Sequence, residues 1–209
     1  SNLKAKENIA ISAGNNITIA SAEDTFNSVS QFQSKKRSSS TEVRQTTQIT
    51  SDLTAQNGSI ELNALGINGG GDINVIASNL TSSAGNINLT AREQINILSD
   101  QDTYSKETAS SKKGFRTKTE TKSINETVTQ VMSNIRAANG SINTRSGSDT
   151  YIIASNLVAG NNATLKVGSY LDSENNEIIN SDATLNILNG KNSKYFYESY
   201  SKITPISLI

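Results

Sequence analysis

The sequence contains no cysteine and no histidine. A zinc site of the usual Cys/His type, a thiol nucleophile, a Ser-His-Asp triad and a histidine acid–base pair are therefore excluded. There is also a single proline, and aromatic residues make up only 5% of the 209 residues. So few aromatic side chains argue against a wide globular core.

Net charge and long apolar runs are missing as well. Nineteen Lys and Arg balance nineteen Asp and Glu, so no net charge attracts nucleic acid, and we expect no nucleic-acid partner. No apolar run approaches the roughly 20 residues that a membrane-spanning helix needs. No signal peptide is recognisable, so the sequence gives no compartment through a targeting segment. We expect the chain to be an excerpt of a longer protein.

The residues that are abundant predict many short strands. Isoleucine outnumbers leucine 23 to 13, and the remainder is dominated by Asn, Ser, Thr and Gly. β-Branched residues favour strands, and the small polar residues favour turns. Local alternation of apolar and polar residues, as in Ile73-Asn74-Val75, is a strand pattern.

Apolar anchors recur every six to eight residues, at Leu53, Ile60, Ile67, Ile73, Leu80, Ile87 and Ile95 and again at Leu157, Leu165, Leu171, Ile178 and Leu185. Three such strands give about 20 residues per turn, which is typical of a solenoid. We therefore predict an all-β, parallel β-helix with Ile, Leu and Val inside. An antiparallel sandwich is the alternative, although it normally has longer strands and a more aromatic core.

A longer repeat overlies the short one. The segment Asn8–Phe26 recurs 78 residues later as Asn86–Tyr104. A Ser/Thr/Lys-rich stretch follows each copy, at about 27–45 and about 105–122, and we expect a third to begin at about 192. We interpret these as excursions from one corner of the solenoid, formed either by a two-stranded hairpin or by a mobile loop. The segment 123–135 also has helical spacing, but its alignment with the strand-like 47–53 favours a strand.

These features together resemble the haemagglutinin repeats of filamentous haemagglutinin-like exoproteins. The resemblance lies in the repeated segments "NITIASAEDT", "GDINVIASNL", "GNINLTAREQINILSDQDT" and "NATLKVGSYLD" and in the basic insert "SSKKGFRTK". It implies a right-handed β-helical filament on the surface of a Gram-negative bacterium, secreted through an outer-membrane transporter by the two-partner route. Some members of this class are adhesins, and others are contact-dependent growth inhibition proteins that deliver a C-terminal toxin.

Few residues are candidates for a site. Asp24 and Asp102 could form a catalytic carboxylate pair, but their equivalence in the repeat favours a structural role. The basic residues of the excursions and Phe115 are candidate partner contacts, although solvated charge and a Phe115 ring folded back onto the solenoid are the simpler alternatives. The candidate contact residues are Lys35, Lys36, Arg37, Lys112, Lys113, Phe115, Arg116 and Lys118.

The sequence as a whole predicts one right-handed β-helix segment over residues 1–209, with no catalytic residue, metal site or cofactor of its own. We expect a monomeric, non-catalytic delivery segment of a contact-dependent growth inhibition protein. Its expected partners are the outer-membrane transporter and the envelope or a receptor of a bacterial or host cell, with possible transient contact with an outer membrane. A host-cell adhesin shaft is the alternative within this class, and a carbohydrate-active β-helix enzyme is the alternative outside it.

Overall fold

The structure is a computed structural model that describes residues 1–67, 69–172 and 174–204. Every regular element in these residues is a strand, which confirms the predicted all-β class, and none of them forms a helix that could span a membrane. The chain divides into two compact units. The solenoid unit comprises Ser1–Ala22, Gln48–Asp100 and Gln130–Lys191, and the sheet unit comprises Glu23–Thr47, Gln101–Thr129 and the described residues from Asn192 onward.

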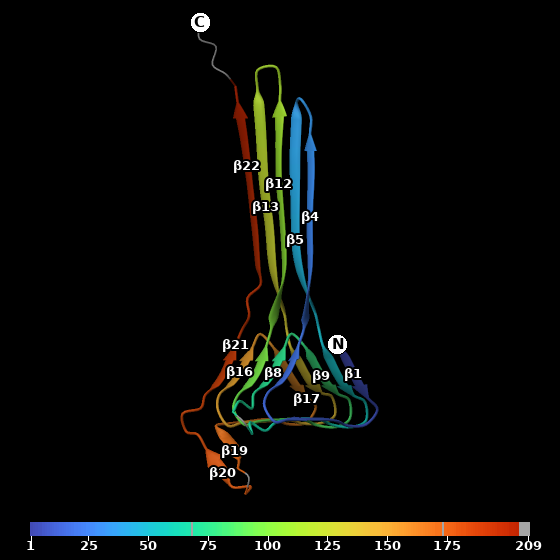
Figure 1. The fold of residues 1–209 in the computed structure, drawn as a ribbon, viewed down its shortest axis with the longest axis vertical. Helices are drawn as coiled ribbons and strands as arrows, with labels where there is room; N and C mark the ends of the chain where they lie inside the picture. The colour runs from blue at the N-terminus through green and yellow to red at the C-terminus, as the bar shows by residue number, and fades with distance from the viewer. Residues whose placement is uncertain (68, 173, 205–209) are drawn as a thin grey trace. The chain divides into compact units, whose positions relative to one another are not determined.

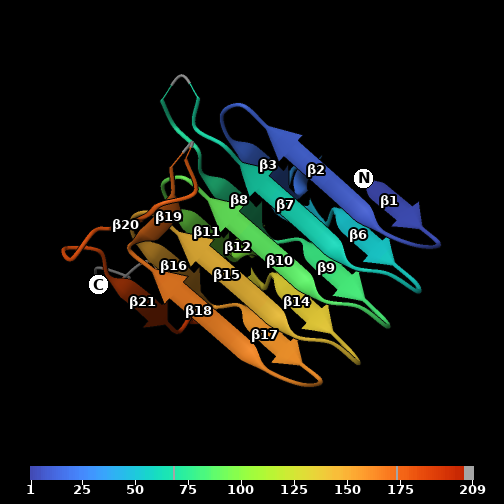
Figure 2. The same ribbon diagram turned by 90° about the horizontal axis from the view of Figure 1, so that it is seen from below.

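The solenoid unit is built from three five-stranded sheets, each with parallel pairing throughout. Successive turns of the chain supply one strand to each sheet, so the predicted parallel β-helix is confirmed (Figure 2). Sheet A consists of β1 (Asn2–Ala5), β6 (Asp52–Ala55), β9 (Asn79–Ser82), β14 (Asn134–Ala137) and β17 (Asn156–Ala159). Sheet B consists of β2 (Ile9–Ala13), β7 (Ile60–Ala64), β10 (Ile87–Ala91), β15 (Ile142–Ser146) and β18 (Ala163–Val167). Sheet C consists of β3 (Ile17–Ala20), β8 (Ile73–Ile76), β11 (Ile95–Leu98), β16 (Thr150–Ile153) and β21 (Leu185–Leu188).

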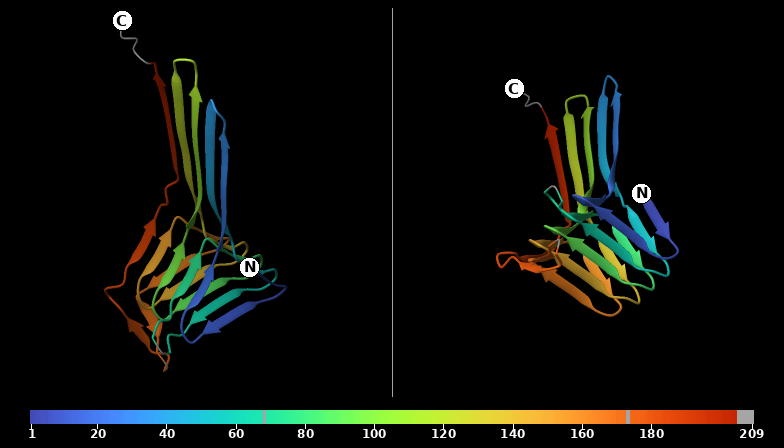
Figure 3. Two further views of the ribbon diagram at one scale, coloured as in Figure 1. Left: turned by 45° about the horizontal axis from the view of Figure 1, so that its top comes forward. Right: turned by 60° about the horizontal axis from the view of Figure 1, so that its bottom comes forward.

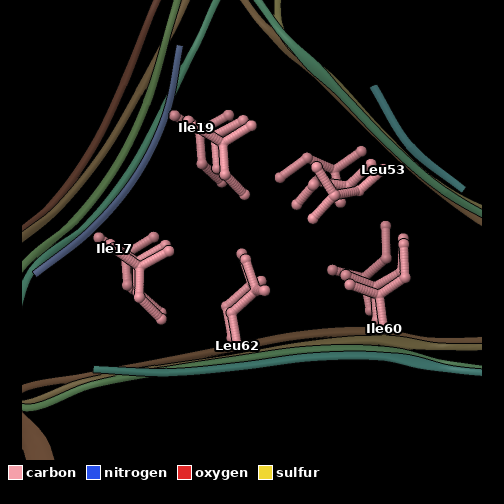
Figure 4. Close-up of a cluster of buried hydrophobic side chains, with 14 of the residues drawn as sticks. Ile17, Ile19, Leu53, Ile60 and Leu62 are labelled. Atoms are coloured by element: carbon pink, nitrogen blue, oxygen red, sulfur yellow. The ribbon is translucent and has the colours of Figure 1, made fainter. Parts of the chain in front are cut away.

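The core of the solenoid consists of apolar side chains stacked in register. Figure 4 shows Ile17 and Ile19 from sheet C, Ile60 and Leu62 from sheet B and Leu53 from sheet A converging on the interior. Each stack is extended by the paired residue of the next turn, as where β10 pairs with β7 and β15. Because alternate residues of a strand point to opposite faces, one row of each strand is enough to fill the interior.

Most of the predicted anchors lie in or against this core, but four do not, one of them being Leu185 of β21, which is 44% exposed. Ile67 is 69% exposed and lies in the loop between β7 and β8. Leu171 and Ile178 lie in β19 (Ser169–Leu171) and β20 (Glu177–Ile179), which pair antiparallel with each other. The prediction that Leu171 and Ile178 are solenoid anchors was wrong, because a short hairpin has the same apolar alternation as two strands of a solenoid turn.

Two kinds of corner join one turn to the next, and this explains the 78-residue repeat. The chain passes directly from β8 to β9 and from β16 to β17, in both cases through an Ile-Ala-Ser-Asn sequence. At the corners between those turns it leaves as β4 (Ala22–Gln33) and β5 (Arg37–Ile49), or as β12 (Asp100–Lys113) and β13 (Lys118–Val131). One repeat therefore contains two turns of the solenoid and one hairpin (Figure 3).

Buried serines connect consecutive turns at these corners. The Ser133 hydroxyl lies 2.7 Å from the carbonyl oxygen of Leu98 and 3.1 Å from that of Val75, and it accepts a hydrogen bond from the Ser78 N–H at 3.2 Å. Ser78 and Ser133 are both fully buried. Ser133 therefore joins three turns in a single network. It also provides the partner for the buried Ser78 N–H, which would be destabilising without one.

Ser133→Ala is expected to lower the free energy of unfolding by about 1–3 kcal/mol, because it leaves the buried Ser78 N–H without a partner. Chemical denaturation followed by circular dichroism measures this loss. Ser155→Ala is the matched control, since the Ser155 hydroxyl donates to the carbonyl of Ile153, two residues before it and within the same turn. Equal losses in the two variants would show that the bond across turns contributes nothing extra.

The outer surface of the solenoid carries ladders of asparagine. In sheet A, the amide nitrogen of Asn134 lies 2.9 Å from the Asn79 amide oxygen, and that of Asn156 lies 3.0 Å from the Asn134 amide oxygen. Asn143 donates to Asn88 in the same way in sheet B, at 2.9 Å. An amide has both a donor and an acceptor, so identical side chains stacked in register satisfy one another.

The sheet unit is a single antiparallel sheet in the order β22-β13-β12-β5-β4, where β22 spans Ser193–Ile203 (Figure 1). The pairing of β12 with β5 joins hairpins that are far apart in the sequence, and β13 pairs with β22. None of the described residues of this unit is buried. The segment 123–131 belongs to β13, which confirms the strand interpretation over the helical one.

Candidate functional site

The two predicted basic segments lie at the turns of the two hairpins. Residues 34–36 join β4 to β5, and residues 114–117 join β12 to β13. Lys112 pairs directly with Arg37, and the Lys113 N–H donates to the Lys36 carbonyl at 2.8 Å. The strand register thus brings together two clusters that are about 78 residues apart in the chain.

We call this end of the sheet the basic tip and define it by the cations Lys35, Lys36, Arg37, Lys112, Lys113, Arg116 and Lys118. Seven of the nineteen cations of the protein therefore gather here, although the net charge is zero. Glu120 forms an ion pair with Lys118. Like charges on adjacent strands repel one another, so concentrating them here costs stability and leaves the tip attractive to an anion. Contact with a partner through these residues stays a prediction.

Phe115 occupies the outermost position of the second turn. Its side chain is 97% exposed, and the Arg116 guanidinium lies 5.5 Å from the ring centroid. With Ile203 of β22 it borders a shallow hollow of about 250 Å³. The turn that carries Phe115 is closed by a 2.7 Å hydrogen bond from the Gly114 N–H to the Thr117 carbonyl. That the ring folds back onto the solenoid stays a prediction.

A larger hollow lies on the sheet itself and was not foreseen from the sequence. It has a volume of about 560 Å³ and is bordered by all five strands. At its edge the Lys122 ammonium lies 2.7 Å from the Glu107 carboxylate, and the hydrogen bond to Glu107 raises the pKa of Lys122 above its ordinary value. The rest of the lining is dominated by small hydroxyl and amide residues, among them Gln31, Gln33, Ser38, Ser40, Ser111, Ser199 and Ser201.

The solenoid unit carries a second polar cluster, which fastens the β19–β20 hairpin. The Arg92 guanidinium stacks 3.3 Å from the centroid of the Tyr170 ring. Glu177 forms ion pairs with Lys166 and Arg145 and accepts a hydrogen bond from Ser169. The hydrogen bond from Lys166, followed by that from Ser169, holds the pKa of Glu177 below its usual value. These ion pairs and the stacked ring tie the hairpin to neighbouring strands, so the cluster is structural.

The candidate carboxylate pair is not assembled. Asp24 lies in β4 and Asp102 lies in β12, and β5 runs between these two strands. Over residues 1–67, 69–172 and 174–204, no group of three or more Asp and Glu side chains is placed to hold a metal ion.

The structure thus defines a class of protein: a repetitive β-solenoid that displays polar hairpins at alternate turns. A family model described as Hemagglutinin repeat matches residues 32–177, and the chain belongs to this family. It is a filamentous, adhesin-like repeat segment of the kind found in secreted surface proteins, and the repeat is structural and non-enzymatic. No curated protein and no solved structure matches the chain.

Proposed function

We propose that this segment is a contact and delivery element of a contact-dependent growth inhibition protein, and that its basic tip engages the anionic envelope of a neighbouring bacterium. The observation that carries the proposal is the gathering of seven cations and an exposed Phe115 at one end of one sheet. Exposed cations cluster in this way where phosphate or carboxylate groups are bound, since Lys and Arg pair with both.

The two units have different physical roles in this proposal. In the solenoid each turn buries its apolar face only against its neighbours, so length can be added without a larger core. The sheet unit has no buried residue among those described, and both of its faces are available to a partner. The solenoid therefore acts as a monomeric, non-catalytic shaft, and the sheet supplies the contacts.

The same proposal includes a route and a target. Secretion by the two-partner pathway of a Gram-negative bacterium would bring the chain out through an outer-membrane transporter. The basic tip would then meet the phosphate-rich outer leaflet of the target cell, where Phe115 is free to make transient contact with the membrane. The support for this step is the charge and exposure of the tip.

The test compares binding to Gram-negative bacteria with binding to cultured epithelial cells. Replacing the seven tip cations with glutamine is expected to reduce binding to bacteria at least about tenfold, because charge-assisted contacts are lost. The difference in binding between the tip variant and the unsubstituted protein should also vanish at about 1 M salt, where the screening length is about 3 Å. A matched control removes seven exposed cations elsewhere, with the substitutions Lys4→Gln, Lys6→Gln, Arg44→Gln, Lys106→Gln, Arg136→Gln, Lys191→Gln and Lys194→Gln.

The outcomes separate the alternatives. Tip-dependent binding to bacteria supports delivery into competitors, whereas tip-dependent binding to epithelial cells alone would make the segment part of a host-cell adhesin. An equal loss in the tip variant and in the control would show that overall charge is responsible and would overturn the assignment of the tip. Cleavage of an acidic polysaccharide by the purified protein would contradict a non-catalytic role.

A further inference from the structure

Beyond Glu23 and Asp24 at its start, the edge strand β4 lacks the features that normally protect a sheet edge. Within the described part of the chain, β5 is the one strand that pairs with β4, and all twelve residues of β4 are exposed. Natural edge strands are usually blunted by charged residues, proline or bulges, because their free N–H and C=O groups recruit other strands. The stretch Thr25–Gln33, "TFNSVSQFQ", has no charged residue and no proline.

Apart from Glu23 and Asp24 at its start, β4 is uncharged, whereas its interior neighbours in this sheet carry charge along their length. β12 carries Lys106, Glu107, Lys112 and Lys113, and β13 carries Lys118, Glu120, Lys122 and Glu126. Phe26, Val29 and Phe32 of β4 are all more than half exposed. A strand with this composition is suited to an interior position, and β4 therefore has the character of a strand with a partner missing.

The repeat shows what that partner is. β4 is equivalent to β12 and β22, each being the strand that leaves the solenoid. The edge that is free in β4 is occupied in the two equivalent strands: β12 pairs there with β5, and β22 pairs there with β13. β5 and β13 are each the returning strand of the preceding hairpin.

The register is the same at both junctions. Thr46 pairs with Thr103 at the first and Val128 with Ser193 at the second, while Arg37–Lys112 corresponds to Thr119–Lys202. From the first junction to the second, equivalent positions lie 82 residues further along the sequence in the returning strand and 90 residues further in the leaving strand. The solenoid shows the same shifts, from Leu53 to Ile135 in sheet A and from Ile95 to Leu185 in sheet C. Hairpin pairing is thus a regular property of the repeat.

We propose that the free edge of β4 is a strand-addition site, and that its occupant is a returning strand of the β13 type from a further unit of the same repeat. Successive hairpins thereby add to one continuous antiparallel sheet. A second copy of this chain has no returning strand to offer, because its β5 and β13 already have partners on both edges. The site recognises an extended Ser/Thr-rich strand through its backbone, as in other β-augmentation complexes.

The repeat also fixes the register of the added strand. The 78-residue repeat relates Ser30 of β4 to Thr108 of β12, which lies opposite Thr41 of β5. The 82-residue shift of the returning strands relates Thr41 to Ser123 of β13. The Lys113 N–H donates to Lys36 across β12 and β5, so odd-numbered residues of β12 make the hydrogen bonds and Thr108 is in a non-hydrogen-bonded pair. Side chains are closest in such pairs, which favours a cross-strand disulfide.

The test uses disulfide trapping, since the protein has no cysteine of its own. The full chain carrying Ser30→Cys is mixed under oxidising conditions with a peptide of residues 118–131 carrying Ser123→Cys. The control peptide carries Ile124→Cys instead, which places the thiol on the opposite face of the added strand. We expect the matched peptide to form the mixed disulfide at least about tenfold faster, because pairing raises the local thiol concentration.

Two further readouts make every outcome decisive. A small thiol reagent should label Ser30→Cys in the folded protein, which shows that the position is accessible. Equal trapping of the matched and control peptides, despite that labelling, would overturn the proposal. Faster formation of the Ser30→Cys homodimer than of the peptide adduct would also overturn it, by showing that a second copy occupies the edge.

Discussion

Replacing Ile87 with aspartate is expected to destabilise the solenoid by about 5 kcal/mol, enough to unfold a unit of ordinary stability. Ile87 is fully buried, and β10 places it directly between Ile60 of the turn before and Ile142 of the turn after. The substitution removes a packed side chain and puts a carboxylate where no partner exists. Because each turn supports its neighbours, the loss should spread along the solenoid.

The measurement is denaturant unfolding followed by far-ultraviolet circular dichroism. Thr90→Asp is the matched control, since Thr90 lies on the same strand, points outward and is exposed. We expect the control to change stability by less than about 0.5 kcal/mol, as surface substitutions usually do. Equal unfolding transitions for the two variants would mean that the interior of the solenoid admits water at this position.

The alternation of apolar residues was enough to predict the solenoid, because its interior is filled by local period-two patterns. Ile60, Ile73, Leu80, Ile87 and Ile95 are all fully buried, as their spacing predicts. The same rule failed at Leu171 and Ile178, where the chain forms a small antiparallel hairpin. A period of two identifies a strand but does not identify the strand it pairs with.

The sheet formed by the hairpins is the part that sequence reasoning missed. Its strands are rich in Ser, Thr and Lys, and they bury no apolar row that would have predicted a face. What assembles them is a long-range register, such as Thr103 opposite Thr46, which depends on where the solenoid releases each hairpin. The basic residues could therefore be identified from the sequence, but their meeting at one tip could not.

The polar ladders account for the unusual composition. Asn79, Asn134 and Asn156 hydrogen-bond in series along sheet A, and corner serines such as Ser133 connect neighbouring turns. These bonds require the same residue type at the same place in each turn. Repetition of Asn and Ser is thus a consequence of stacking, in the same way as repetition of isoleucine inside.

The corners also explain why glycine recurs before the strands of sheet B. Gly58, Gly85 and Gly140 stack on one another, and a methyl group built on Gly140 would lie 2.1 Å from the Gly85 carbonyl oxygen and 2.5 Å from its carbonyl carbon. The obstacle is the backbone of the turn below, which cannot move aside as a flexible side chain can. The hydrogen atom of glycine is what allows the turns to approach to the strand spacing of about 4.8 Å.

Gly140→Ala is therefore expected to destabilise the solenoid by about 3 kcal/mol, as overpacking against a fixed backbone does. The control is Gly14→Ala at another corner, where the added methyl would meet only the flexible Ile67 side chain at 3.8 Å. Thermal unfolding of both variants measures the difference, with Gly14→Ala close to the unsubstituted protein. If Gly140→Ala unfolds at the same temperature as the control, the turns can separate locally at little cost, and close stacking of the corners does not hold the solenoid together.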